Sequence, residues 1–320
     1  MFPGKRQVDS AVGLDGDGLA WVSRATLIAL KNSGNRLPLK AAKIRSQQGG
    51  SYLSRFRGRG MEFDEARPYQ PGDEIRHLDW RVTARTGRAH TKLFREERER
   101  AVILWVDYRA PMFFATRGSF KSVLASQAAA MIAWGACNQG DRLGALIFSE
   151  QKHQELRPAN GDRAVLNLIG RLAESSSLPP RASAPEKRRE ALLHALARVR
   201  RVTRPGALLF LLSDFRDLDK SAEIHLSALA RHNELVLLRI HDRLEAELPT
   251  SGQYPVSDGY QRLSLQGADR KLHQRYSQQN LDRQDYLGQL CQRYRMHLLH
   301  CSTDCDLGET LAQGLGRRVR

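Results

Sequence analysis

The run AVILWV at residues 101–106, followed by DYRAP at residues 107–111, decides the fold of this chain. Six consecutive apolar residues, including β-branched and aromatic types, predict a short strand that is buried on both faces. Strands of that kind belong to parallel sheets, because helices cover both faces of such sheets. The run therefore predicts a central strand of an α/β domain, with Asp107 at its carboxyl end.

Similar apolar runs recur along the rest of the chain and alternate with segments of helical periodicity. Further strands are expected at residues 142–148, 207–212, 234–240 and 296–300. Helices are expected at residues 120–138, 162–173, 186–202, 219–231, 266–292 and 307–315, and a hairpin at 254–265. This alternation predicts an α/β fold with a mostly parallel sheet and helices on both faces.

Upstream of these runs, residues 58–80 read GRGMEFDEARPYQPGDEIRHLDW, which mixes both charge signs with aromatic and turn residues. Pro71-Gly72 predicts a turn, because proline presets φ and glycine tolerates φ > 0. Met61 and Phe63 alternate with polar residues, as on a half-buried strand. We expect a small strand-rich module here, with its last strand at residues 91–94.

The acids and bases of this module resemble a catalytic cluster in composition, and paired carboxylates can serve acid–base chemistry. Each of these acids has a basic residue close in sequence, however, and ion pairing keeps carboxylates ionised. We therefore interpret Asp73, Arg76, Asp79 and Arg85 as a structural salt-bridge network, in which Asp79 and Arg85 form a buried pair.

The module resembles the signature of the domain-of-unknown-function 58 (DUF58) family. The matching residues include Arg67, Tyr69, Gly72, Asp73, Arg76, Asp79, Trp80 and Arg85. The similarity continues through KLFREE at residues 92–97 and GDRLG at residues 140–144. Members of this family are similar to von Willebrand factor A domains and are usually associated with MoxR-type AAA+ ATPases. The resemblance implies such a fold, and as partners it implies a MoxR-type ATPase and other von Willebrand factor A proteins. It implies no reaction.

Three parts of the chain are expected from these patterns. They are an N-terminal tail and helix at residues 1–57, the strand-rich signature module at 58–100, and a von Willebrand factor A-like domain at 101–320. Within the first part, the apolar spacing of residues 18–30 predicts an amphipathic helix.

The resemblance also implies a place for a metal, because related domains carry D-x-S-x-S after the first strand. Here Asp107 matches, but Arg109 and Pro111 occupy the serine positions. Asp214 matches a later aspartate, and no threonine is found at residues 186–196, where one is expected. Since Mg²⁺ demands a nearly complete octahedron of oxygen ligands, we expect a degenerate metal-ion-dependent adhesion site without metal or cofactor. Arg109 would then pair with Asp107 or Asp214.

Two further interpretations of the same residues stay open. Ligands bind beyond the carboxyl ends of strands in open α/β sheets, so Asp107, Arg109, Pro111 and Asp214 also form the candidate surface for a partner. The alternative is an ordinary surface loop, in which the two aspartates cap the helices that follow.

The four cysteines, Cys137, Cys291, Cys301 and Cys305, do not indicate a disulfide framework in so long a chain. Three of them lie near His297 and His300, but their spacing matches no standard pair of zinc knuckles. We therefore expect no metal in this region either.

The formal net charge of +16 favours an acidic partner, nucleic acid or an anionic membrane surface. The basic residues are interleaved with acids, and no GxGxxG loop, P-loop, GxSxG elbow or RNA-binding signature is present. No signal peptide or run of about 18 apolar residues is found, so we expect a cytoplasmic protein.

Three functions are compatible with these patterns. The first is a non-catalytic interaction protein, an adaptor or assembly factor that works with a MoxR-type ATPase. The alternative is a basic nucleic-acid-binding protein, which rests on charge alone. A metal-dependent hydrolase has the least support, because neither metal ligands nor a nucleophile are assembled. The sequence thus favours a protein that is not an enzyme.

Overall fold

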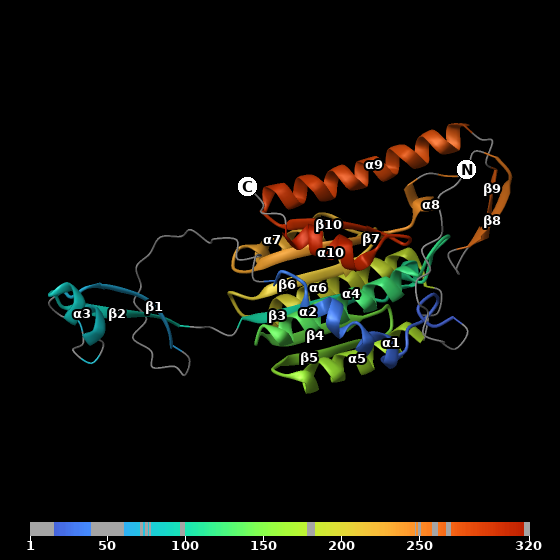
Figure 1. The fold of residues 1–320 in the computed structure, drawn as a ribbon. Coiled ribbons are helices and arrows are strands. Elements are labelled where there is room, and N and C mark those ends of the chain that lie inside the picture. Colours follow the sequence, from blue (N-terminus) through green and yellow to red (C-terminus); the bar gives the residue numbers. More distant parts are fainter. Residues whose placement is uncertain are drawn as a thin grey trace, which may run out of the picture. The chain divides into compact units, whose positions relative to one another are not determined.

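The chain folds into two compact units, which Figure 1 draws as ribbons. One unit comprises residues 1–44 and 100–320, and the other comprises residues 45–99. The computed structural model describes residues 16–39, 61–70, 73, 76, 78–96, 100–177, 183–246, 248, 251–257, 262–266 and 270–316. In the described part of the chain, no helix is long and apolar enough to cross a membrane.

The larger unit is built on a six-stranded sheet with the strand order β10-β7-β6-β3-β4-β5. All neighbouring strands run parallel except β4 and β5, which are antiparallel. The strands are β3 (Ala101–Asp107), β4 (Arg142–Phe148), β5 (His153–Ala159), β6 (Leu208–Ser213), β7 (Glu234–His241) and β10 (His297–Ser302). The predicted α/β class with a mostly parallel sheet is confirmed.

The edge strand β5 has no counterpart in the sequence prediction. Along its sequence, HQELRPA, exposed and half-buried side chains alternate, because only one face of this edge strand packs against the rest of the unit. Such a strand contains no continuous apolar run. The signal that reveals the five other strands of this sheet is therefore missing from β5.

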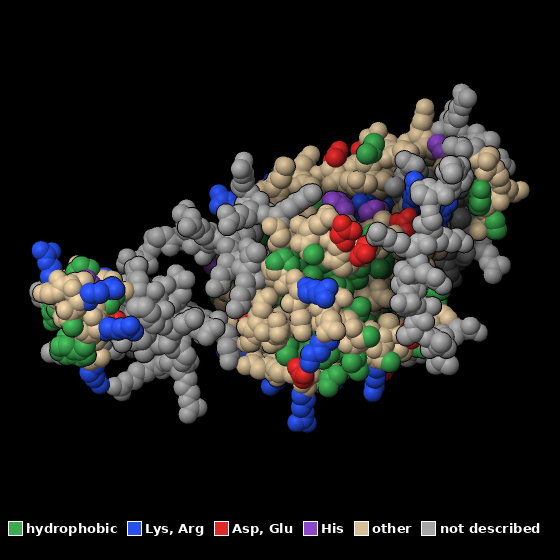
Figure 2. All heavy atoms as spheres, in the orientation of Figure 1, with side chains coloured by type: hydrophobic (Ala, Val, Ile, Leu, Met, Phe, Trp, Pro, Cys, Tyr) green, Lys and Arg blue, Asp and Glu red, His purple; other side chains and the backbone are tan. Residues whose placement is uncertain are grey.

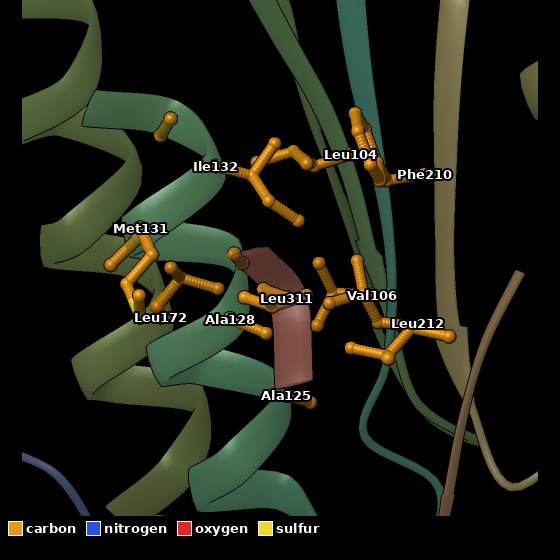
Figure 3. Packing of buried hydrophobic residues seen from close by; sticks show 14 of the residues in the cluster. Leu104, Val106, Ala125, Ala128, Met131, Ile132, Leu172, Phe210, Leu212 and Leu311 are labelled. Atoms are coloured by element: carbon orange, nitrogen blue, oxygen red, sulfur yellow. The ribbon is translucent and has the colours of Figure 1, made fainter. Parts of the chain in front are cut away.

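Helices cover both faces of the sheet (Figure 1). One face packs against α4 (Lys121–Asn138), α5 (Asp162–Ser177) and α10 (Leu307–Gly316). Helices α1 (Arg24–Ala29) and α2 (Lys31–Asn35) pack against α4, and α1 also packs against α5. The other packs against α6 (Pro185–Val202), α7 (Lys220–Ala230) and α9 (Arg270–Arg293). Alternate residues of β3 serve the two cores: Leu104 points to the first and Trp105 to the second. Figure 3 shows Ile132 and Ala128 of α4 facing the first side of the sheet.

The N-terminal helices belong to the sheet unit, whereas the sequence prediction keeps residues 1–57 apart. Of the predicted helix at residues 18–30, only α1 is helical, residues 18–23 are not, and α2 follows beyond the predicted end. Ser23 caps α1 by accepting a hydrogen bond from the Thr26 N–H. Helix α2 approaches α4 very closely: a Cβ at Gly34 would lie 2.5 Å from the backbone oxygen of Met131. Only glycine allows that approach.

Short elements complete the larger unit. A 3₁₀ turn, η3 (Ala110–Met112), follows β3, and α8 (Arg243–Ala246) follows β7. The predicted hairpin is present as β8 (Gln253–Ser257) paired antiparallel with β9 (Arg262–Gln266).

The smaller unit contains the strands predicted near Met61 and at residues 91–94, and one helix that was not predicted. Strand β1 (Met61–Pro68) pairs with β2 (His90–Glu96), and α3 (Trp80–Thr86) lies between them in the chain. The Asp79 carboxylate caps α3, and Gly87 ends it with a φ of 72°. A helix of seven residues shows too little periodicity to be found from its pattern.

Candidate functional site

Three of the four predicted residues meet at the carboxyl edge of the sheet. Strands β3 and β6 are neighbours, and the strand order reverses between them, because β4 lies on one side and β7 on the other. Open α/β sheets bind ligands at such a switch point. Asp107 ends β3, and Asp214 directly follows β6, so the two aspartates lie at this point.

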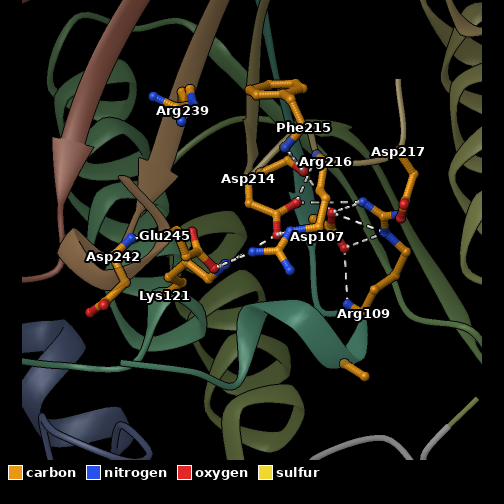
Figure 4. A network of polar contacts seen from close by, with 12 residues as sticks. Asp107, Arg109, Lys121, Asp214, Phe215, Arg216, Asp217, Arg239, Asp242 and Glu245 are labelled. Atoms are coloured by element: carbon orange, nitrogen blue, oxygen red, sulfur yellow. Dashed lines mark hydrogen bonds and ion pairs between the residues drawn. The ribbon is translucent and has the colours of Figure 1, made fainter. Parts of the chain in front are cut away.

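Arg109 lies between these aspartates and is fully buried. Its Nε is 3.0 and 3.1 Å from the two carboxylate oxygens of Asp107, and its Nη2 is 2.7 Å from Oδ2. Nη2 also lies 3.9 Å from Oδ1 of Asp214. On its other side, Nη1 donates to the Asp217 carboxylate at 2.7 Å and to the Arg188 carbonyl at 3.1 Å. Figure 4 shows the guanidinium among the carboxylates of Asp107, Asp214 and Asp217.

This arrangement changes the predicted partner surface. Asp107 and Arg109 are both 0% exposed, so Arg109 cannot offer its charge to another molecule in this structure. Pro111 is only half buried but lies in η3, where it begins the 3₁₀ turn and provides no polar side-chain atom. Only the neighbours of these residues can form a contact surface.

The electrostatics of Arg109 follow from its partners. Burial alone would lower the pKa of Arg109, but the carboxylates of Asp107, Asp214 and Asp217 outweigh burial and raise it. The pKa of Asp217 is raised, chiefly by its own burial, although Arg109 opposes this shift. Arg109 therefore stays charged and balances the acids around it.

A second buried cation, Lys121, was not singled out by the sequence analysis. It begins α4 and is fully buried. Its Nζ lies 3.1 Å from Oδ2 of Asp214 and 2.6 Å from Oε1 of Glu245. Burial would raise the pKa of Asp214, but the positive charges of Lys121, Arg216 and Arg109 lower it well below its ordinary value.

One sequence signal could have revealed Lys121. It is the only charged residue of the segment at 121–138, whose other residues are largely apolar or small. Since a lysine on a helix that is buried nearly all round needs a partner, such a position indicates a buried carboxylate nearby. Nothing in the sequence says which carboxylate this is.

The turn after β6 is held in an unusual conformation. Phe215 has a φ of 52°, which bulky residues rarely adopt. The turn directs the Phe215 N–H to Oγ of Ser213 and the Arg216 N–H to Oδ1 of Asp214. The Ser213 hydroxyl in turn donates to Oδ2 of Asp107 at 2.6 Å. Such backbone strain costs about 1–3 kcal/mol and persists where the surroundings over-determine it.

The donor set does not fit a metal ion. Both carboxylate oxygens of Asp107 already accept hydrogen bonds from the Arg109 guanidinium, and Asp214 is bound by Lys121. A divalent cation would have to displace these charges. Among the described residues, no three His, Cys, Asp or Glu side chains are grouped so that they could hold a metal. These contacts neutralise buried charge. They also connect the turn after β3 with the turn after β6 and the first turn of α6, and they connect Asp214 with the start of α4.

The signature residues of the smaller unit form a looser network. Nη2 of Arg67 lies 2.7 Å from Oδ1 of Asp73, and hydrogen bonds from the Gln70 N–H and Arg67 lower the pKa of Asp73. The Tyr69 N–H donates to the Ala89 carbonyl. Arg76 is exposed. Gly72 lies outside the described residues.

The predicted buried pair of Asp79 and Arg85 is not formed. Oδ1 of Asp79 instead accepts hydrogen bonds from the N–H groups of Arg81 and Val82 at 3.0 and 3.1 Å. Arg85 is exposed in the last turn of α3. Asp79 is buried because it caps a helix, and Trp80 beside it is 69% exposed.

The cysteine region is arranged differently from a zinc site. The sulfur atoms of Cys301 and Cys305 lie 2.8 Å apart. Nε2 of His297, in contrast, is 2.9 Å from the Gly314 carbonyl oxygen, so this ring makes a backbone contact. Cys291 is buried in the core on the opposite face of the sheet.

Comparisons with known proteins agree with the signature. The chain is 32% identical over 209 residues to uncharacterized proteins of Mycobacterium bovis and Mycobacterium tuberculosis. The match covers 65% of this chain and 64% of theirs, so the chain spans less than two thirds of these relatives.

Two solved structures match this chain at 12% identity. The conserved hypothetical protein BatB from Bacteroides thetaiotaomicron has a TM-score of 0.39, and the match covers 68% of this chain and 97% of that one. A von Willebrand factor type A protein from Catenulispora acidiphila has a TM-score of 0.34, and the match covers 72% and 45%. The family model described as "Protein of unknown function DUF58" matches residues 65–286. This chain therefore belongs to the DUF58 family.

Proposed function

We propose that this chain is a non-catalytic, cytoplasmic interaction protein that acts as an adaptor or assembly factor with a MoxR-type AAA+ ATPase. The partner class comes from the family resemblance. The observation that carries the proposal is the burial of Arg109 among Asp107, Asp214 and Asp217. Open α/β sheets bind ligands at this edge, and in this protein the Arg109 guanidinium occupies the position.

The network supports binding rather than catalysis on physical grounds. A general base must have a free lone pair within reach of a substrate proton. The carboxylate of Asp107 is fully buried and engaged by Arg109 and Ser213, so it is not available. We further propose that this is a degenerate metal-ion-dependent adhesion site, in which Arg109 provides the positive charge.

The buried centre of the network cannot contact a partner, but the exposed residues around it, such as Arg189, can. The Arg109 guanidinium donates to the carbonyl of Arg188 in the first turn of α6, so this end of α6 lies beside the network. The next residue, Arg189, has a side chain that is 56% exposed and lies 3.8 Å from Asp219. Loops that are tied to one another by buried ion pairs present such exposed residues in a fixed arrangement, which lowers the entropic cost of binding.

The alternative, a nucleic-acid-binding protein, rests on the net charge of +16. Proteins of that kind usually gather Lys and Arg into a patch or stripe. On the face of the sheet unit drawn in Figure 2, the Lys and Arg side chains are scattered. Many cations are also neutralised within the unit, for example Arg100 by Glu234 at 3.0 Å.

Co-purification tests the proposal. The tagged full chain is isolated from its own cells at about 0.3 M salt, where the Debye length is well below 10 Å and weak charge contacts are screened. We expect mass spectrometry to identify a MoxR-type ATPase in near-stoichiometric amount. Arg189→Glu should reduce its recovery several-fold, whereas Arg163→Glu, an exposed residue of α5, should not.

Two results would overturn the proposal. One is recovery of stoichiometric RNA or DNA without any ATPase, which would favour the nucleic-acid alternative. The other is saturable binding of Mg²⁺ by the purified protein that disappears in Asp107→Asn, since this would mean that a metal displaces Arg109.

A further inference from the structure

A polar pocket lies beside the ion-pair network, between the carboxyl edge of the sheet and α9. Its volume is about 180 Å³. Its lining includes Asp214 and Arg216 from the turn after β6, Arg239 from β7, Glu245 from α8, and Asn280 and Arg283 from α9. The pocket therefore lies at the edge where open α/β sheets bind ligands.

One residue of this pocket, Arg239, is a buried cation that has no ion-pair partner among the described residues. Only 9% of it is exposed. Within the described part of the chain, its hydrogen bonding amounts to one long contact of 3.4 Å from Nη2 to Oδ1 of Asn280. In Figure 4 no dashed line reaches Arg239, which stands apart from the network around Asp214. Buried charges are normally paired, so Arg239 requires an explanation.

The nearby carboxylates cannot serve as this partner, because other groups already bind them. Asp214 accepts from Nζ of Lys121 and from the Arg216 N–H. Glu245 accepts from Lys121 and Arg216 through Oε1, and from the Asp242 N–H through Oε2. Burial lowers the pKa of Arg239; the charges of Glu245 and Asp214 oppose this shift without cancelling it, and Arg216 adds a smaller lowering effect.

The pocket thus carries an excess of positive charge. Its lining contains three arginines, Arg216, Arg239 and Arg283, but only two carboxylates, and Lys121 pairs with both of these from the core side. Arg283 is exposed on α9 and completes the open side. Because Oδ1 of Asn280 accepts from Arg239, its amide N–H₂ remains a donor for another group.

We propose that this pocket binds a small oxyanion, a phosphate or carboxylate group, between the guanidinium groups of Arg239 and Arg283. Guanidinium forks match both groups with two parallel hydrogen bonds. An anion there would supply the charge that Arg239 lacks. The strained turn at Phe215, which also lines the pocket, holds Arg216 at its margin.

Calorimetric titration of the full chain tests this inference. Inorganic phosphate and acetate are titrated separately in Tris chloride at constant ionic strength, so that general salt effects cancel. We expect saturable binding of at least one of them with one site per chain. Binding of phosphate alone would identify a phosphate site, and binding of both would identify a general oxyanion site.

Variants locate the site. Arg239→Met should weaken binding at least tenfold, and Arg283→Gln several-fold, while the distant control Arg163→Gln binds like the wild type. Without anion, Arg239→Met should melt no lower than the wild type, because it removes an uncompensated buried charge. If Arg239→Met does not fold, the test depends on the exposed variant Arg283→Gln alone. The proposal is overturned if neither anion binds saturably, or if the pocket variants bind as tightly as the control.

Discussion

The two units of this protein both concentrate acidic and basic residues, but they place them in different surroundings. In the sheet unit, Asp107, Arg109 and Lys121 are fully buried. In the smaller unit, the paired side chains of Arg67 and Asp73 remain 31% and 17% exposed. Breaking a buried pair leaves an uncompensated charge in a poor solvent, whereas water compensates an exposed one. The same residue types should therefore determine stability in one unit and contribute little in the other.

Asp79 refines this comparison, since it is a buried acid in the smaller unit. Its carboxylate is satisfied by two backbone N–H groups of α3 and not by an arginine. Burial alone therefore does not identify an ion pair. The partner of the carboxylate determines what its removal costs.

The largest expected effect is that of Arg109→Met, which leaves Asp107 buried without a counter-charge. We expect the free energy of unfolding of the sheet unit to fall by about 3–5 kcal/mol. Urea titration monitored by the fluorescence of the buried Trp105 measures this. The double variant Asp107→Asn with Arg109→Met should regain part of the loss, because it removes both charges. A single-variant loss no larger than that of an exposed pair would contradict the buried-network interpretation.

Asp214→Asn should show a smaller loss, on the order of 3 kcal/mol at pH 7, because Lys121 keeps Glu245 as a partner. This loss should depend on pH. The folded-state pKa of Asp214 is lowered, so the wild-type advantage is present above the ordinary Asp pKa of about 3.9. It should disappear as pH falls from about 5 towards the folded-state pKa.

Urea unfolding of wild type and Asp214→Asn between pH 7 and pH 3 measures this convergence. Lys31 and Asp162, an exposed pair at 2.8 Å, provide the control: the loss caused by Asp162→Asn should be small at every pH. A difference between wild type and Asp214→Asn that stays constant with pH would show that the carboxylate charge is not what stabilises the fold.

In the smaller unit, Asp79→Ala should cost about 1 kcal/mol, because α3 loses its N-cap. Asp79→Asn should retain most of the stability, since an asparagine side chain also caps helices. Hydrogen exchange of the backbone amides of Arg81 and Val82 measures the effect locally. Equal protection in Asp79→Ala and wild type would rule out the capping role.

The smallest expected effect is that of Arg85→Ala, which should leave the exchange rates of α3 unchanged within error. Arg85 is exposed, and exposed side chains of this kind contribute little to stability. A loss as large as that of Asp79→Ala would restore the original prediction that Asp79 and Arg85 act as a pair.

The sequence by itself determined the buried strands. Unbroken apolar runs such as residues 101–106 and 207–212 avoid water only when both faces of the strand are buried. Such strands are typical of parallel sheets with helices on each side. It also placed Asp107 and Asp214 at one edge, because carboxyl ends of parallel strands meet there. The half-buried edge strand β5 carries no such run and escaped prediction.

Only the tertiary structure decided what these aspartates do. Lys121 of α4 pairs with Asp214, Glu245 of α8 pairs with Lys121, and Asp217 in the turn after β6 pairs with Arg109. These partners are distant from Asp107 in the chain. The first turn of α6 adds the Arg188 carbonyl to the partners of Arg109. Hydrophobic periodicity records which side chains are buried, but not which charges burial brings together. That pairing depends on how the covering helices pack, because a charge removed from water takes whichever partner the packing provides.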